Sequence, residues 1–292
     1  WTWKIRTGIV SPSVSPENAN RGQTRPVTFL TDFGYSDEYP GVCRLVIASI
    51  DPRIKVIDLT HGIPPGDIRR GGLALAAAVR FSAPAVHLAV VDPGVGSRRR
   101  AVVLTCGEHH LVGPDNGLLS LATAVLGGVE AAFDVSATPV RVGRSDTFHG
   151  RDVFSPVAAE LARGAAPGEL GEAVGFRELA PLELPEPLVT PEQVDAHVLY
   201  PDQYGNVILN IHSEVLDGTF FTEGDAISLE TSLQKLEVPL RRTFADVEPG
   251  EPVLFTDSSG YLALAINRGS AASRFGLGPD NQLRFTPVAS RQ

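Results

Sequence analysis

A chain of 292 residues can form one large domain or two of ordinary size, and its 43% hydrophobic content is ample for a core. The 25 basic and 34 acidic side chains leave a formal net charge of −9. This charge argues against a general nucleic-acid binder, whose affinity comes largely from neutralising phosphates. No apolar run reaches the length of a membrane span. The only cysteines, Cys43 and Cys106, argue against a disulfide framework or a thiolate zinc site but leave one long-range disulfide open.

The first 26 residues, WTWKIRTGIVSPSVSPENANRGQTRP, lack the charged head and continuous apolar stretch of a signal peptide. For residues 1–26 we expect a disordered or loosely docked arm, or a segment added for expression. Because no export signal is seen, the expected location is the cytoplasm.

Short apolar runs alternate with helical patterns from Val27 onward. The predicted strands are VTFLTDF, IKVIDLT, AVHLAVVD and RAVVLTC. The predicted helices are residues 39–50, DIRRGGLALAAAVRF with Asp67 as its N-cap, GLLSLATAV, and HGRDVFSPVAAELARG. This alternation predicts an α/β domain over residues 27–180 with a largely parallel central sheet covered on both faces. Ligands of such sheets bind beyond the carboxyl ends of the strands, where Asp32, Asp92 and residues 60–62 are expected.

The composition changes in the segment RELAPLELPEPLVTPEQ, where prolines break helices and predict an extended linker over residues 181–193. Short β-like runs follow: VDAHVLY, GNVILNI, AISLE, EPVLFTD and YLALAIN. Glycine and aspartate punctuate them, which is typical of a small β-barrel or sandwich. We therefore expect a second, smaller domain over residues 194–292.

The stretch VVDPGVGSRRR, residues 90–100, ends an apolar strand on the carboxylate of Asp92. A carboxylate there must be hydrated, paired or used, because burying it unpaired is costly. Arg99 is a natural partner once the glycine turn brings the chain back. Arg98 and Arg100 alternate with Arg99, so at most one face of the triplet points inward. The ordinary alternative is a tight turn whose glycines take positive φ and whose arginines are solvated.

Two further positions have a chemical and an ordinary interpretation. Asp32, at the end of the first strand, suits hydrogen bonds to a ribose diol, or it is an ordinary helix N-cap or turn residue. His149 lies just before a helix, with Gly150 allowing close approach, and can position a water or exchange a proton. A structural histidine explains the same pattern. Asn116, in GPDNGLL, is assigned first to a turn.

Familiar active-site motifs are missing from the sequence. The Walker pattern G-x-x-x-x-G-K-[ST] is not present, and the last position of G-x-G-x-x-G falls on Arg99. There is no H-E-x-x-H zinc motif and no G-x-S-x-G elbow. Neither His61 nor the pair His109 and His110 has metal-ligand spacing, so we expect no metal site.

Taken together, TDFG, DLTHGIPPGDI, VVDPGVGSRRR, GPDNGLL, TFHGRD, DQYGN and SSGYLALAIN occur in an order that resembles one family. These are the adenosine-forming S-adenosyl-L-methionine (SAM) hydrolases, or SAM hydroxide adenosyltransferases, which are related to the fluorinase and chlorinase. The resemblance covers about Val27 to Leu283. It implies an N-terminal α/β domain, a C-terminal β-barrel, and a homotrimer with active sites between subunits.

The implied reaction is attack of water or hydroxide on the ribose 5′ carbon of SAM, which gives adenosine and L-methionine without a cofactor. The resemblance places its catalytic set on Asp92, Arg99 and His149. It implies that Asp32 binds the ribose diol and that Asp37 lies near the amino-acid part. Polar or stacking contacts from the second domain are implied for Asp202, Tyr204, Asn206, Ser258, Ser259 and Asn267, of which Asp202 also suits a structural role.

Two alternatives stay open. A halide-dependent adenosyl transferase is disfavoured by DPGVGSRR together with His149, since the halogenating relatives have a different loop there. A non-catalytic sensor of SAM or adenosine is disfavoured because Asp92, Arg99 and His149 are all present. The expected partners are SAM and its two products, with no nucleic acid and no membrane.

Overall fold

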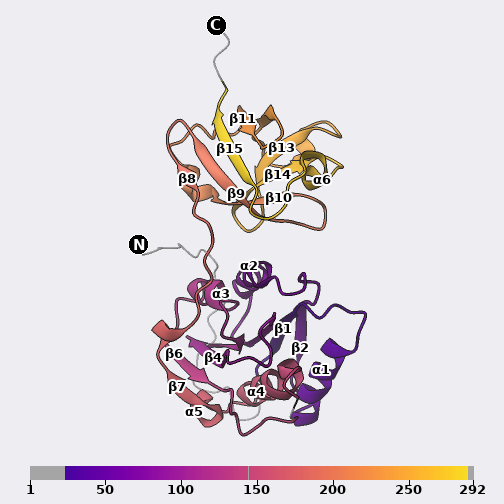
Figure 1. The fold of residues 1–292 in the computed structure, drawn as a ribbon, viewed down its shortest axis with the longest axis vertical. Coiled ribbons are helices and arrows are strands. Elements are labelled where there is room, and N and C mark those ends of the chain that lie inside the picture. The colour runs from indigo at the N-terminus through magenta and orange to yellow at the C-terminus, as the bar shows by residue number, and fades with distance from the viewer. Residues whose placement is uncertain (1–23, 144, 289–292) are drawn as a thin grey trace.

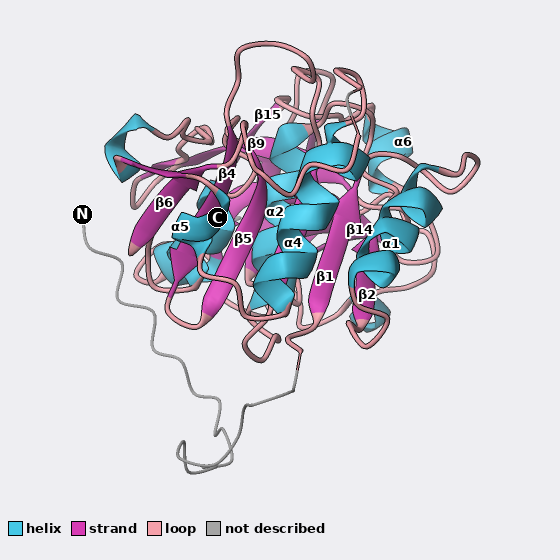
Figure 2. Ribbon diagram, turned by 90° about the horizontal axis from the view of Figure 1, so that it is seen from below, coloured by secondary structure: helices cyan, strands magenta, loops and turns pink. Residues whose placement is uncertain are grey.

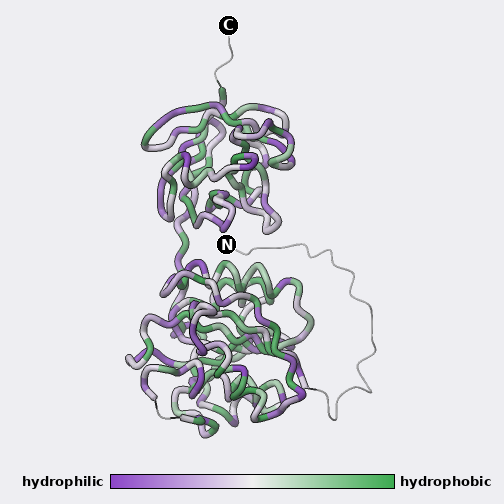
Figure 3. Tube along the Cα trace, turned by 90° about the vertical axis from the view of Figure 1, so that its right-hand side faces the viewer, coloured by the Kyte–Doolittle hydropathy of each residue, from purple (hydrophilic) through white to green (hydrophobic). Residues whose placement is uncertain are grey.

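The computed structural model describes residues 24–143 and 145–288, which form two bodies joined by one connecting segment (Figure 1). The arm predicted over residues 1–26 therefore falls almost entirely outside the described residues. Figure 3 shows hydrophobic stretches inside both bodies, as expected if each has its own core. The apolar clusters agree, because the residues of the first body and those of the second fall in separate clusters.

The first body is built around a seven-stranded sheet with the order β2-β1-β3-β5-β4-β6-β7. The parallel part consists of β1 (Val27–Thr31), β2 (Val56–Thr60), β3 (Val86–Val90) and β5 (His109–Pro114). Antiparallel strands extend one edge: β4 (Ala101–Cys106), β6 (Ala131–Asp134) and β7 (Glu172–Val174). The predicted α/β class is confirmed.

Helices cover both faces of this sheet because successive strand side chains point to opposite sides. Val27 and Phe29 pack toward α1 (Tyr39–Ile50) and α4 (Ser155–Ala162). Leu30 packs in a second core, under α2 (Ile68–Val79) and α3 (Ser120–Val125). Figure 2 shows α1 and α4 lying across the strands. Cys43 and Cys106 are free and belong to the two different cores, so the disulfide that the sequence left open does not form.

The second body is an antiparallel sheet with the order β12-β11-β15-β9-β10-β14-β13. A bridge between Leu240 and Leu254 brings the two end strands together, so the sheet is nearly closed into the predicted barrel. The strands are β8 (Leu188–Val189), β9 (Val194–Pro201), β10 (Val207–His212), β11 (Ala226–Glu230), β12 (Lys235–Pro239), β13 (Pro252–Thr256), β14 (Tyr261–Ile266) and β15 (Gln282–Pro287). The short helices α5 (Pro167–Leu170) and α6 (Ala271–Phe275) complete the two bodies.

The start of α2 faces the second body. Arg69 pairs with Asp280, and the guanidinium carbon of Arg70 lies 4.1 Å from the centre of the Tyr200 ring. Asp67 caps this helix as predicted, accepting the Arg70 N–H at 2.8 Å. No helix in the described part of the chain combines the length and apolar character needed to span a bilayer.

Candidate active site

The carboxyl ends of β1, β2 and β3 meet at one edge of the sheet, as the parallel arrangement requires. Asp32 follows β1 and accepts the Gly66 N–H at 2.8 Å, from the loop that follows β2. Burial raises the pKa of Asp32; the Gly66 N–H opposes that shift, and the negative charge of Asp92 adds to it. Two carboxylates, Asp32 and Asp92, therefore share this edge.

Asp92 and Arg99 form the ion pair that the sequence predicted. The Arg99 Nε donates to Asp92 Oδ1 at 2.9 Å, and Nη2 donates to the other carboxylate oxygen. The two side chains are 5% and 10% exposed, respectively. A bidentate pair this well buried holds the guanidinium in one orientation.

His149 contacts the same guanidinium, with its Nδ1 2.8 Å from Arg99 Nη2. An arginine has only donors, so Nδ1 must be the acceptor, and a neutral His149 then carries its proton on Nε2. Burial lowers the pKa of His149, and the positive charges of Arg99 and Arg141 lower it further. The structure thus favours a neutral imidazole whose Nε2–H is available as a donor.

The backbone after His149 departs from the predicted continuous helix. Gly150–Phe154 is a π-helical turn, and the α-helix begins only at Ser155. Wide turns of this kind are frequent at functional sites. A Cβ at position 150 would lie 3.0 Å from the Phe33 ring, so glycine allows the close approach that the sequence suggested. Phe148 packs edge-on against Phe33, with the ring centres 5.8 Å apart.

The turn of DPGVGS touches the segment that precedes His149. Gly96 has φ +78°, and a Cβ there would lie 2.7 Å from the backbone oxygen of Asp146. Buried Asp152 shapes the same segment by accepting the Ser145 N–H at 2.9 Å and by pairing with Arg151. The approach of Gly96 to Asp146 and the hydrogen bond between Arg99 and His149 bring the loop of Asp92 and the loop of His149 together.

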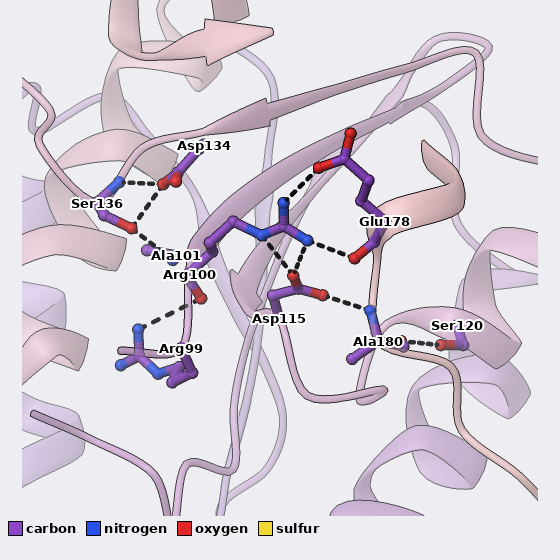
Figure 4. A network of polar contacts seen from close by, with 9 residues as sticks. All are labelled: Arg99, Arg100, Ala101, Asp115, Ser120, Asp134, Ser136, Glu178 and Ala180. Atoms are coloured by element: carbon purple, nitrogen blue, oxygen red, sulfur yellow. Dashed lines mark hydrogen bonds and ion pairs between the residues drawn. The ribbon is translucent and has the colours of Figure 1, made fainter. Parts of the chain in front are cut away.

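The three arginines have different surroundings. Arg100 lies between Asp115 and Glu178, with Nε 2.8 Å from Asp115 Oδ2, and Figure 4 shows Arg99 joined to this network only through the backbone carbonyl of Arg100. Arg98 is exposed, as the ordinary interpretation of the turn expects. Only Arg99 enters the site. Asn116 is a turn residue, since its side chain donates to the Val91 carbonyl and accepts the Leu118 N–H.

Three of the predicted binding residues lie in the turn between β9 and β10. Asp202 Oδ1 accepts the backbone N–H groups of Tyr204 and Asn206 at 2.8 and 2.9 Å, and Oδ2 accepts the Asn206 side-chain amide at 2.8 Å. Asp202 thus has the structural role that the sequence allowed. Tyr204 is 71% exposed, so its ring is free to stack on a planar group.

The remaining candidates are less closely grouped. Ser258 and Ser259 lie in the turn between β13 and β14, where the Ser259 N–H donates to Asp257. The Asn267 side chain donates to the Val247 carbonyl at 2.7 Å, and Asp37 is exposed before α1. Within residues 24–143 and 145–288, no hydrogen bond or ion pair joins the second-body candidates to Asp32, Asp92, Arg99 or His149. The two sets are not brought together by such contacts within one chain.

Sequence reasoning placed His61, within residues 60–62, beyond the carboxyl end of a strand and considered it as a metal ligand, but assigned it no role. The side chain is fully buried, with Nδ1 2.7 Å from Oγ1 of Thr31, the residue before Asp32. Its position after β2, beyond the carboxyl end of a parallel strand, was the available signal. In the described residues no group of three or more histidine, cysteine, aspartate or glutamate side chains could hold a metal ion.

The comparisons with known proteins match both bodies. Residues 27–171 match the model of the SAM hydroxide adenosyltransferase N-terminal domain, and residues 196–284 match that of the C-terminal domain. The chain is 46% identical over 265 residues to the (R)-S-adenosyl-L-methionine hydrolase of Salinispora tropica, covering 89% of this chain and 97% of that protein. The fluorinase of an Actinoplanes species is 28% identical, over 86% of this chain and 94% of the relative.

Solved structures show the same fold. A crystal structure of an uncharacterised conserved protein from Thermotoga maritima aligns with a TM-score of 0.82 at 31% identity, covering 89% of this chain and 99% of that one. A conserved hypothetical protein from Thermus thermophilus aligns with a TM-score of 0.71 at 39% identity, over 89% and 99% of the two chains.

Proposed function

Because the chain belongs to the SAM hydroxide adenosyltransferase family, we propose that it is an enzyme that hydrolyses S-adenosyl-L-methionine to adenosine and L-methionine. The observation that carries this proposal is the partly buried contact of Asp92, Arg99 and His149, in a chain whose relatives at 46% identity are named hydrolases. The 28% identity to a fluorinase is lower, which favours water over halide as the nucleophile.

The reaction needs no general acid, because its leaving group departs without being protonated. Water attacks the ribose 5′ carbon, the electron pair of the breaking carbon–sulfur bond goes to sulfur, and the positive sulfonium becomes a neutral thioether. What remains is to hold one water in line with that bond and to remove its proton. We propose no metal or organic cofactor for this step, since the leaving group is already activated.

The hydrogen bonds assign different roles to the three residues. Arg99 can only donate, and Nδ1 of His149 is already occupied by Arg99, so neither is suited to take the proton. We assign its acceptance to Asp92, whose carboxylate keeps lone pairs beyond those bonded to Arg99. The Nε2–H of His149 and the Arg99 guanidinium then orient the water and stabilise charge on its oxygen.

Binding roles follow from placement. Asp32, at the carboxyl end of β1, is proposed to accept both ribose hydroxyls, and Asp37 to lie near the amino-acid part. Tyr204, Asn206, Ser258, Ser259 and Asn267 are proposed to contact the adenine side. Because no polar contact joins them to the triad within the described chain, we propose that a homotrimer completes each site with a neighbouring subunit. Light scattering of the purified protein tests for a trimer.

The first experiment follows adenosine and methionine by chromatography after incubation with SAM in halide-free buffer, using each sulfonium epimer separately. The relatives are named for the (R) form, so we propose that this epimer is consumed faster. Arg99→Ala and His149→Ala should be nearly silent. Binding without turnover would indicate a sensor, and product formed only with added chloride or fluoride would indicate a halogenase. Unchanged turnover after dialysis against EDTA supports a metal-free reaction.

A further inference from the structure

His61 is a titratable side chain that the proposed reaction does not use. It is fully buried, directly after β2, and its ring packs edge-on against Phe29 and Tyr35, with ring centres 4.7 and 5.1 Å away. Nδ1 lies 2.7 Å from Thr31 Oγ1. The His61 carbonyl accepts the Gly34 N–H, also at 2.7 Å. One residue therefore contacts the chain on both sides of Asp32.

Thr31 links His61 to the backbone around Asp32. Its Oγ1 also accepts the Phe33 N–H at 3.1 Å, so its own hydrogen is free to point to Nδ1 of His61. In that arrangement Nδ1 is an acceptor, and the neutral ring carries its proton on Nε2. The Nε2 atom lies 3.3 Å from Asp58 Oδ1, but the two are not aligned as a hydrogen bond.

Charged groups lie beside the Nε2 atom of the His61 ring, opposite the nitrogen that contacts Thr31. Asp58, on β2, pairs with Arg44 from α1, so its carboxylate is held between a cation and the imidazole. Burial lowers the pKa of His61 more strongly than Asp58 raises it, which favours the neutral ring. His61 is neutral and buried, its ring is fixed at Nδ1 by Thr31, and its backbone carbonyl is fixed by Gly34. It is therefore suited to holding the segment around Asp32 in place.

We propose that His61 is a positioning residue that sets the place of the Asp32 carboxylate and thereby the affinity for the ribose. This inference rests on the proposed function. Asp32 is held from the same loop by the Gly66 N–H, so the residues following β2 fix both its backbone and its carboxylate. Contacts to ribose hydroxyls are present in the bound substrate and in the transition state alike. Losing them raises KM and leaves kcat nearly unchanged.

The test compares His61→Leu with Thr31→Val, which removes the same hydrogen bond from the other side, together with the one accepted from the Phe33 N–H, with little change of shape. Each is expected to raise KM for SAM about tenfold with kcat within about threefold, and the double variant no further than Thr31→Val, because that variant already removes the contact between Thr31 and His61. His61→Asn can keep a polar atom near Nδ1 and is expected to retain most of the affinity.

A matched control lies in the same sheet. His87 is also fully buried, with Nδ1 2.8 Å from Thr28 Oγ1, but it is near the amino end of β3, away from Asp32. His87→Leu and Thr28→Val should lower stability without changing KM. The proposal would be overturned if the His61 and Thr31 variants left KM unchanged, or if the His87 and Thr28 variants raised KM equally.

The unmutated protein distinguishes failure of the proposed function from failure of the positioning role. If it does not cleave SAM, calorimetric dissociation constants for adenosine make the same comparison. Weaker adenosine binding confined to His61→Leu and Thr31→Val supports the positioning role. Equal binding in all variants overturns that role, and a parent that binds no adenosine overturns both proposals.

Discussion

Four acceptors surround the guanidinium of Arg99, which explains the need for arginine at this position. Two are the carboxylate oxygens of Asp92, the third is His149 Nδ1, and the fourth, at 3.4 Å, is the Arg100 carbonyl. The planar fork satisfies them together and remains charged at any working pH. A lysine carries the same charge as a single compact group and cannot match this geometry.

We therefore expect Arg99→Lys to lower kcat about 100-fold or more, although the charge is kept. The rate of adenosine formation at saturating SAM measures this loss. Arg98→Lys, at an exposed position in the same turn, is the control and should leave the rate unchanged. A rate for Arg99→Lys near that of the parent would show that charge alone suffices.

The tautomer of His149 predicts a pH dependence. Burial and two nearby arginines lower its pKa, so the neutral form persists to the acid side of an ordinary histidine. Below that pKa a proton on Nδ1 would face the donors of Arg99. We expect kcat to fall at acid pH through His149 protonation and to lose this decline in His149→Gln, which retains a donor near Nε2. An acid decline that survives in His149→Gln would assign it to another group.

At the scale of elements, the site depends on two loops meeting. The turn after β3 carries Asp92 and Arg99, and the segment before the π-helical turn carries His149. Gly96 lies where they touch, and its φ of +78° is strained for any other residue. The same two loops are joined by the hydrogen bond between Arg99 and His149, so we expect the contact at Gly96 to affect the distance between these side chains.

Gly96→Ala is expected to lower kcat about tenfold or more, because a Cβ 2.7 Å from the Asp146 carbonyl would push the two loops apart. Gly107→Ala is the matched control, since Gly107 also has positive φ, in the turn between β4 and β5, with open space around it. Both variants should lose about 1 kcal/mol of stability through strain. Equal activity of the two variants would contradict a role for the contact.

At the scale of the whole molecule, the sequence predicted the parallel strands and their helices because periodicity and caps are local signals. The helix over residues 39–50 and the Asp67 cap are confirmed with the predicted bounds. Strands β5, β6, β7, β8, β12 and β15 were not predicted, and β8 lies inside the predicted linker. In HHLVGP, for example, two histidines and a glycine conceal a strand that only its neighbours β3 and β4 stabilise.

The candidate site likewise has parts that local sequence signals predict and parts that depend on contacts between distant segments. The pairing of Asp92 with Arg99 could be predicted because seven residues and a glycine turn separate them. The contact with His149 came only from family resemblance, since it joins loops 50 residues apart. His61 was placed at the end of its strand but was assigned no role, because nothing in the sequence marks a histidine as buried or shows which side chain it contacts. Whether the second-body residues reach the substrate stays a prediction.

A buried histidine near the amino end of β3, His87, predicts how stability varies with pH. His87 bonds Thr28, and its Nε2 lies 3.0 Å from His109 Nδ1 with the two rings stacked. Burial, and secondarily the charge of His109, lower the pKa of His87 to about 4. An unfolded histidine has a pKa of about 6.5, so between these values the unfolded chain binds a proton that the folded chain does not.

Stability from His87 is therefore complete above pH of about 6.5 and is lost as the pH falls toward 4, by on the order of 3 kcal/mol. Burial likewise lowers the pKa of His110 to about 4, which steepens the decline of the parent. His87→Gln should unfold at a lower temperature near neutral pH but lose less on acidification. Calorimetric melting temperatures across this range test it, and parallel pH curves for parent and variant would show that His87 does not carry the effect.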